Sequence, residues 1–127
     1  KLDTNTFELE YAGAYNSLYL FHEGELFRYK ADRMPVGSTI KEENSFTNQT
    51  IQLYPGDVFY LFTDGYPDQF GGPNSKKFTY GRFRNLLQDI HLKTAEEQKH
   101  ILSQKLHEWK GDKPQIDDIL VIGVKIH

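Results

Sequence analysis

The sequence predicts an α+β fold with a mainly antiparallel sheet, because strand patterns come first, two helix patterns follow, and one more strand pattern closes the chain. Alternating or wholly apolar runs between turn residues indicate the strands. Apolar residues spaced three and four apart indicate the helices. We expect the helices to lie on one face of the sheet and to cover it with their apolar residues.

The first half of the chain contains most of the predicted strands. Residues 7–12 alternate between apolar and polar, as a half-buried strand does. Residues 18–29 predict a hairpin with Glu-Gly in its turn. The polar stretch 39–53 predicts one long bent strand or two short ones, and residues 58–63 predict a buried strand that follows a Pro-Gly-Asp turn.

The second half contains the predicted helices. Residues 71–77 are rich in glycine and polar residues, which indicates a mobile loop. A narrow apolar stripe then predicts a helix, and its members are Phe83, Leu86, Leu87 and Ile90. The pair Thr94 and Glu97 has the spacing of a capping box and begins a second helix, which Gly111 ends. Residues 119–126 predict the last strand.

Composition excludes several classes of protein. A chain of 127 residues without cysteine fits one domain and has no disulfide, thiolate metal site or cysteine nucleophile. The net charge of −3 argues against nucleic acid as a partner. No apolar run approaches the roughly 20 residues of a membrane span, and we expect a cytoplasmic location. The five histidines are predicted to be surface or structural residues.

Acidic residues stand at the ends of two predicted strands. Asp64 follows the buried strand 58–63, and Asp117 and Asp118 precede the last strand. Two carboxylate sites at strand ends suggest one oxygen-rich site for a hard metal ion such as Mg²⁺ or Mn²⁺. The competing interpretation is that Asp-Gly is a turn pair and that Asp-Asp is merely solvated.

Five motifs, in order along essentially the whole chain, resemble those of the metal-dependent type 2C protein phosphatases, in the bacterial branch typified by sporulation protein E and RsbU. In that branch a "GD…TDG" element matches the run that ends in Thr63, Asp64 and Gly65, and a terminal "DD" element matches Asp117 and Asp118. The other three matching stretches are Leu9 to Ala14, Met34 to Gly37, and Asp64 to Gly72.

The resemblance implies a sandwich of two antiparallel sheets flanked by helices and a centre with two Mn²⁺ or Mg²⁺ ions. It makes Asp64 and Asp117 metal ligands and assigns no catalytic side chain, because the nucleophile is water activated by the metal. Four further residues are expected to support the ligands or the adjoining loop: Thr63, Gly65, Asp68 and Asp118. Lys76 and Lys77 are candidates for contact with substrate phosphate, against the interpretation that they form a solvated loop tip.

One element of the family is missing. The family has a Gly-rich "D-x-x-G-H-G" element, and nothing in this sequence matches it. We therefore interpret residues 1–127 as the C-terminal portion of a single phosphatase domain. The sheet edges left by the missing half predict that these residues are not an active monomer by themselves. We expect a self-associating or domain-swapped dimer, or a need for the other half of the domain.

The resemblance implies an activity and partners. The parent protein would hydrolyse phosphoserine or phosphothreonine on a protein in bacterial signal transduction or stress response. Its substrate would be a phosphoprotein such as an anti-sigma-factor antagonist, and a sensor domain would precede the phosphatase domain. One alternative is a non-catalytic partner-binding module with a degenerate or truncated phosphatase fold. Another is a β-rich structural domain without metal dependence.

Overall fold

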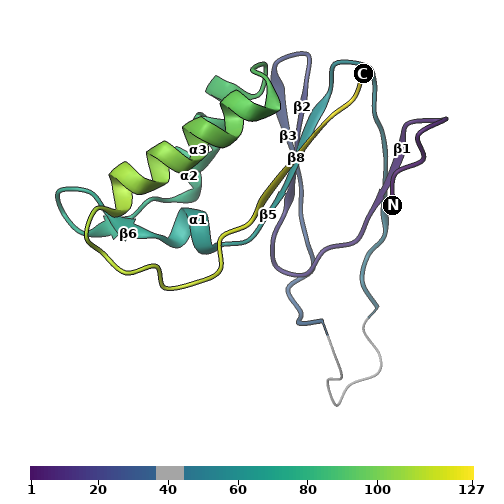
Figure 1. Cartoon of the computed structure of the whole chain (residues 1–127). Helices are drawn as coiled ribbons and strands as arrows, with labels where there is room; N and C mark the ends of the chain where they lie inside the picture. The colour runs from purple at the N-terminus through teal and green to yellow at the C-terminus, as the bar shows by residue number, and fades with distance from the viewer. Residues whose placement is uncertain (37–44) are drawn as a thin grey trace. The chain divides into compact units, whose positions relative to one another are not determined.

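The computed structural model describes residues 1–36 and 45–127 (Figure 1). The chain forms two compact units. The first contains residues 1–62 and 122–127, and the second contains residues 63–121. The last residue of the Met34 to Gly37 motif and the start of the stretch 39–53 lie outside the described residues.

The first unit contains two antiparallel sheets. The smaller pairs β1 (Glu8–Tyr11) with β4 (Gln49–Gln52). The larger has the strand order β3-β2-β5-β8, which is built from β2 (Leu18–His22), β3 (Glu25–Tyr29), β5 (Val58–Phe62) and β8 (Val121–Lys125). The predicted hairpin at 18–29 is therefore confirmed, with Leu18 opposite Tyr29 and His22 opposite Glu25.

The two sheets of the first unit share one apolar core. Its buried members come from both sheets and from the last residues of the chain: Leu9, Tyr11, Leu18, Leu20, Ile51, Leu53, Phe59 and Ile126. Side chains alternate between the two faces of a strand, so strands with apolar residues at every second position can face each other in this way. The first unit thus contains two antiparallel sheets around a shared core, as the family resemblance implies.

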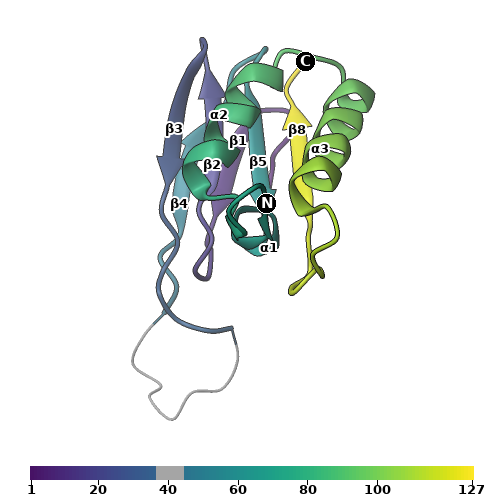
Figure 2. The same ribbon diagram turned by 90° about the vertical axis from the view of Figure 1, so that its left-hand side faces the viewer.

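Strand β8 lies beside β5 at the edge of the larger sheet (Figure 2). Backbone hydrogen bonds join Gly56 to Ile126 at one end of the pair and Thr63 to Leu120 at the other, so the strands are antiparallel. Each of these two bonds lies within one unit. Because β5 ends at Phe62 and β8 begins at Val121, this pairing places the C-terminal end of β5 beside the N-terminal end of β8.

The second unit contains the helices. It consists of α1 (Gly65–Asp68), β6 (Phe70–Gly71), β7 (Lys76–Lys77), α2 (Tyr80–Ile90) and α3 (Ala95–Lys110). In α2 the side chains of Phe83, Leu87 and Ile90 are buried, which confirms the predicted stripe. The predicted capping box of α3 is also confirmed, since Thr94 and Glu97 bond to each other's backbone N–H.

Aromatic side chains form the centre of the second unit. Tyr66 packs edge-on against Phe78 with ring centroids 5.3 Å apart, and its ring is tilted by 35° against that of Phe83 at 5.0 Å. Phe78 in turn meets Trp109 edge-on at 5.5 Å. These contacts join α1, the residue after β7, α2 and α3, and the Tyr66 hydroxyl also donates to the Leu102 carbonyl at 2.8 Å.

The structure corrects two expectations about the residues after Asp64. The stretch 71–77, expected to be a mobile loop, is largely a tight hairpin in which β6 pairs with β7. Glycine is needed there for close packing, because a Cβ at Gly71 would overlap the backbone carbonyl of Trp109. The short helix α1 was not predicted, because four residues are too few to show a helical period.

The predicted fold class, α+β with antiparallel sheets and helices, is confirmed. Within the described residues, no helix is both long enough and apolar enough to cross a membrane.

A histidine–aspartate pair fixes the turn before β5. Asp57 is 3% exposed, and its carboxylate accepts from the Tyr54 N–H at 2.9 Å and pairs with His22 Nδ1 at 2.7 Å. This hydrogen bond is the main reason why the pKa of His22 is raised, and burial acts in the opposite direction. The nearby charges of Asp57, Glu23 and Glu25 also raise the pKa.

We expect the pair to make stability depend on pH. A raised pKa means that the folded state holds the proton more tightly, so the contribution is complete below the ordinary pKa of about 6.5 and is lost as the pH rises through the raised value. In urea unfolding of the complete domain, His22→Gln should therefore lose more stability relative to wild type at about pH 6 than at about pH 8.5. The exposed His107→Gln is the control. An equal loss at both pH values would contradict the prediction.

Candidate metal centre

Asp64 occupies the first bend after β5. Its backbone is helical and caps α1, and its carbonyl accepts from the Asp68 N–H at 2.9 Å. Its side chain makes no capping hydrogen bond to the helix. The carboxylate of an aspartate at the N-cap commonly accepts hydrogen bonds from the first N–H groups of the helix. The Asp64 carboxylate accepts none of them.

Asp117 lies in an exposed stretch that precedes β8. The Asp117 carboxylate accepts from the Asp118 N–H at 2.7 Å, and its carbonyl accepts from the Gln115 side-chain amide at 2.9 Å. Ile116, beside it, is 57% exposed although it is apolar. One local hydrogen bond therefore holds the carboxylate, and a second holds the backbone of Asp117, on a solvent-accessible segment.

The residues on either side of Asp64 both contact this second segment. The Thr63 hydroxyl donates to the Asp118 carbonyl at 2.7 Å and accepts from the Leu120 N–H at 2.9 Å. Gly65 lies so close that a Cβ there would overlap the Asp118 carbonyl. The two acidic segments, far apart in sequence, are thus joined through the neighbours of Asp64 and Asp117.

The remaining predicted site residues lie at the hairpin. Asp68, at the end of α1, pairs with Lys77 on β7, with Oδ1 and Nζ 3.1 Å apart. Lys76 is exposed beside it. Lys77 is therefore paired with a carboxylate, and both lysines are exposed candidates for contact with phosphate.

A family model described as Stage II sporulation protein E (SpoIIE) matches residues 1–127, the whole sequence. The chain belongs to the SpoIIE family. No curated protein matches the sequence.

Solved phosphatase domains share this fold. The SiaA-PP2C domain of Pseudomonas aeruginosa is 34% identical with a TM-score of 0.82, over 94% of this chain and 46% of that one. The SpoIIE phosphatase domain of Bacillus subtilis, presoaked with Mn, is 15% identical with a TM-score of 0.67, over 99% of this chain and 54% of that one. A Bacillus subtilis structure with a fragment of the regulatory domain is 18% identical with a TM-score of 0.74, over 98% of this chain and 36% of that one.

These matches show a PP2C-type protein phosphatase domain family, and the chain spans about half or less of the solved chains. Asp64 and Asp117 are the two residues that the family resemblance makes candidate metal ligands. Carboxylate oxygens suit Mg²⁺ and Mn²⁺, and Mg²⁺ needs only one or two protein carboxylates per ion. Across residues 1–36 and 45–127, no three or more histidine, aspartate or glutamate side chains form a group that could hold a metal ion. Asp64 and Asp117 therefore remain predicted metal ligands.

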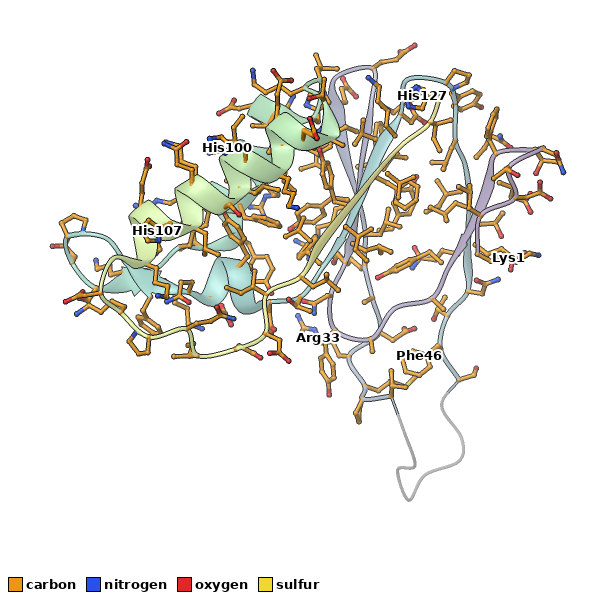
Figure 3. The ribbon with its side chains drawn as sticks, in the orientation of Figure 1. Lys1, Arg33, Phe46, His100, His107 and His127 are labelled. Atoms are coloured by element: carbon orange, nitrogen blue, oxygen red, sulfur yellow. The ribbon has the colours of Figure 1, made fainter. Side chains whose placement is uncertain are left out.

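Within the part of the chain that the structure describes, the histidines join no group of metal ligands. His100 and His107 are exposed on α3, about two turns apart (Figure 3). His91 is buried at the end of α2, where Nδ1 lies 2.7 Å from the Gln88 carbonyl.

One residue of the second unit was not singled out from the sequence. Gln69 is completely buried, and its side-chain amide bonds to the segment that carries Asp117. A glutamine just after a short helix has no periodic pattern that predicts burial. The one sequence feature that could have drawn attention to Gln69 is its position between Asp64 and the pair Gly71-Gly72.

Proposed function

We propose that the domain containing this chain hydrolyses phosphoserine or phosphothreonine on a protein and that Asp64 and Asp117 hold part of a pair of Mn²⁺ or Mg²⁺ ions. The supporting observation is that Thr63 and Gly65 both contact the backbone of Asp118. Turn pairs that merely ended two strands would need no such contact.

The side chains have distinct roles in this proposal. Divalent ions held by Asp64 and Asp117 would neutralise charge on phosphoryl oxygens and would supply an activated water. Asp64 and Asp117 supply anionic oxygen ligands, and Thr63 fixes the spacing of their backbones through its two hydrogen bonds. Lys76 lies on the exposed hairpin, where it offers a positive charge to a phosphorylated substrate.

The chain by itself is proposed to be inactive. Its two predicted ligands would bind Mn²⁺ only weakly, since affinity for hard cations depends on the number of charged ligands. Association into a dimer through exposed edges is part of the same proposal. It is supported by the edge position of β8 and by the exposure of Leu120 (53%) and Ile122 (43%).

The proposed partners follow from the family. The substrate is a phosphoprotein of a bacterial signalling or stress pathway, such as an anti-sigma-factor antagonist. A sensor domain that precedes the phosphatase domain regulates the activity.

A non-catalytic binding module is the second candidate. It is favoured by the observation that no group of three ligands occurs among the described residues. Such a module would bind a phosphoprotein or another partner without turnover.

The test is hydrolysis of a phosphoserine peptide and of p-nitrophenyl phosphate by the complete parent domain, with and without Mn²⁺. We expect turnover that chelation abolishes and that Mn²⁺ restores, and no turnover by residues 1–127 alone. Binding of the phosphopeptide without release of phosphate would instead support the binding module.

A further inference from the structure

The segment that carries Asp117 has little structure of its own. Residues 114–118 are exposed and belong to no helix or strand. Fixing the backbone of one residue costs about 1–2 kcal/mol in conformational entropy, so an exposed stretch is ordered only where outside groups hold it. A metal ligand on such a stretch depends on those groups for its position.

Gln69 provides one of them. Its side chain is 0% exposed, and its amide nitrogen donates to the Phe70 carbonyl and to the Pro114 carbonyl, each at 2.9 Å. Pro114 is the residue at which the exposed stretch begins. We propose that Gln69 is a positioning residue that places Asp117 for metal binding, an inference that rests on the proposed function.

The backbone of Gln69 is itself rigidly held. Its carbonyl accepts from the Phe78 N–H at 2.9 Å and from the Trp109 indole N–H at 3.0 Å. Its N–H donates to the Tyr66 carbonyl at 3.3 Å. The Gln69 side chain thus starts from a backbone that the aromatic centre of the second unit holds in place. These buried contacts fix the position from which its amide bonds to Pro114.

The orientation of the amide is determined by its partners. Both partners of the nitrogen are carbonyl oxygens, and the reversed amide would place its own oxygen against them. In this orientation Oε1 has no hydrogen-bond partner among the described residues. A buried polar atom without a partner lowers the stability of the folded state. The hydrogen bond that the amide nitrogen donates to the Pro114 carbonyl offsets this loss.

Asp117 lies between two anchors that come from one short piece of chain. Gln69 holds the start of its segment at Pro114, and Thr63 holds the end at Asp118 and Leu120. Asp64 lies between Thr63 and Gln69 in the sequence. Residues 63–69 therefore carry one predicted ligand and both clamps that position the other.

The test compares two glutamines in the complete domain. Gln69→Met keeps the length of the side chain and removes its donors. The matched control is Gln98→Met, because the Gln98 amide also donates to backbone carbonyls, at Lys93 (2.9 Å) and His91 (3.2 Å), away from Asp117.

Two readouts are expected to change in Gln69→Met and not in the control. Hydrogen exchange at residues 115–120 of the metal-free domain should become about 10-fold faster, the equivalent of one lost hydrogen bond. The Mn²⁺ dissociation constant from calorimetry should rise by about 10- to 100-fold, as for other groups that orient a ligand. The KM for the phosphopeptide at saturating Mn²⁺ should stay unchanged.

Other outcomes would overturn the inference. Changes equal to those of Gln98→Met, or faster exchange with unchanged Mn²⁺ affinity, would show that Gln69 only supports the fold. Should Gln69→Met not fold, Gln69→Asn keeps an amide that is too short to reach Pro114 and is judged by the same criteria. If Asp64→Asn and Asp117→Asn both leave Mn²⁺ affinity unchanged, the proposed function itself fails, and hydrogen exchange in the Gln69 variant still reports whether Gln69 orders the segment.

Discussion

Replacement of Asp64 by asparagine is expected to lower kcat/KM of the complete phosphatase domain by about 10²- to 10³-fold, the range found when one group that stabilises charge in a transition state is removed. Asparagine keeps the shape of the side chain and loses its negative charge. The backbone contacts of Thr63 and Gly65 use no atom of the Asp64 side chain, so they should persist. The measurements are steady-state hydrolysis of a phosphoserine peptide at several Mn²⁺ concentrations and calorimetric Mn²⁺ affinity.

Asp117→Asn should behave in the same way, and Asp112→Asn is the matched control. Asp112 is exposed and lies in the same connection between α3 and β8 as Asp117, but outside the clamped stretch. We expect near wild-type activity for the control. If the Asp64 variant binds Mn²⁺ as tightly as the control does, Asp64 is not a ligand.

Local patterns in the sequence predict the local structure well. The capping box at Thr94 and Glu97 depends on two residues within one helical turn, so the sequence contains all the information needed. The same holds for the hairpin between β2 and β3, whose turn lies between two apolar runs. The strand that ends before Asp64 is equally local, because its five residues are apolar throughout.

Features that depend on distant contacts were not predictable in this way. The hairpin of β6 and β7 has two residues in each strand, and its glycines are explained by Trp109 of α3, which no local pattern reveals. The burial of Gln69 likewise depends on Pro114 and on Trp109. The sequence predicts that carboxylates stand at the ends of two strands. It does not predict the hydrogen bonds of the Thr63 hydroxyl and the Gln69 amide that hold the two segments together.

The contacts around Asp64 suggest why a threonine and a glycine flank it. Thr63 needs a hydroxyl that both donates and accepts, since it bonds to the Asp118 carbonyl and to the Leu120 N–H. Gly65 needs the absence of a side chain, since the Asp118 carbonyl occupies the space of a Cβ. The two residues thus contribute to the predicted site through backbone spacing.

Gly65→Ala is accordingly expected to destabilise the complete domain by about 1–3 kcal/mol, the usual cost of overpacking. In an open helical position the same change would be stabilising by about 0.5–1 kcal/mol, because glycine loses more conformational freedom on folding. Here the added methyl group would overlap the Asp118 carbonyl and come within 3.0 Å of the Ile119 side chain, so the backbone must move. We expect this movement to separate the segments that carry Asp64 and Asp117. Because both are predicted ligands, the Mn²⁺ affinity should fall together with the stability.

Gly81→Ala provides the matched control, because a Cβ at Gly81, in the first turn of α2, would meet only the Thr79 hydroxyl oxygen at 3.9 Å. We expect this variant to be as stable as wild type or more stable by up to about 1 kcal/mol, with unchanged Mn²⁺ affinity. Urea unfolding and calorimetric Mn²⁺ titration of the two variants measure both effects. Equal stability and equal Mn²⁺ affinity in the two alanine variants would show that close approach at Gly65 is not what joins the acidic segments.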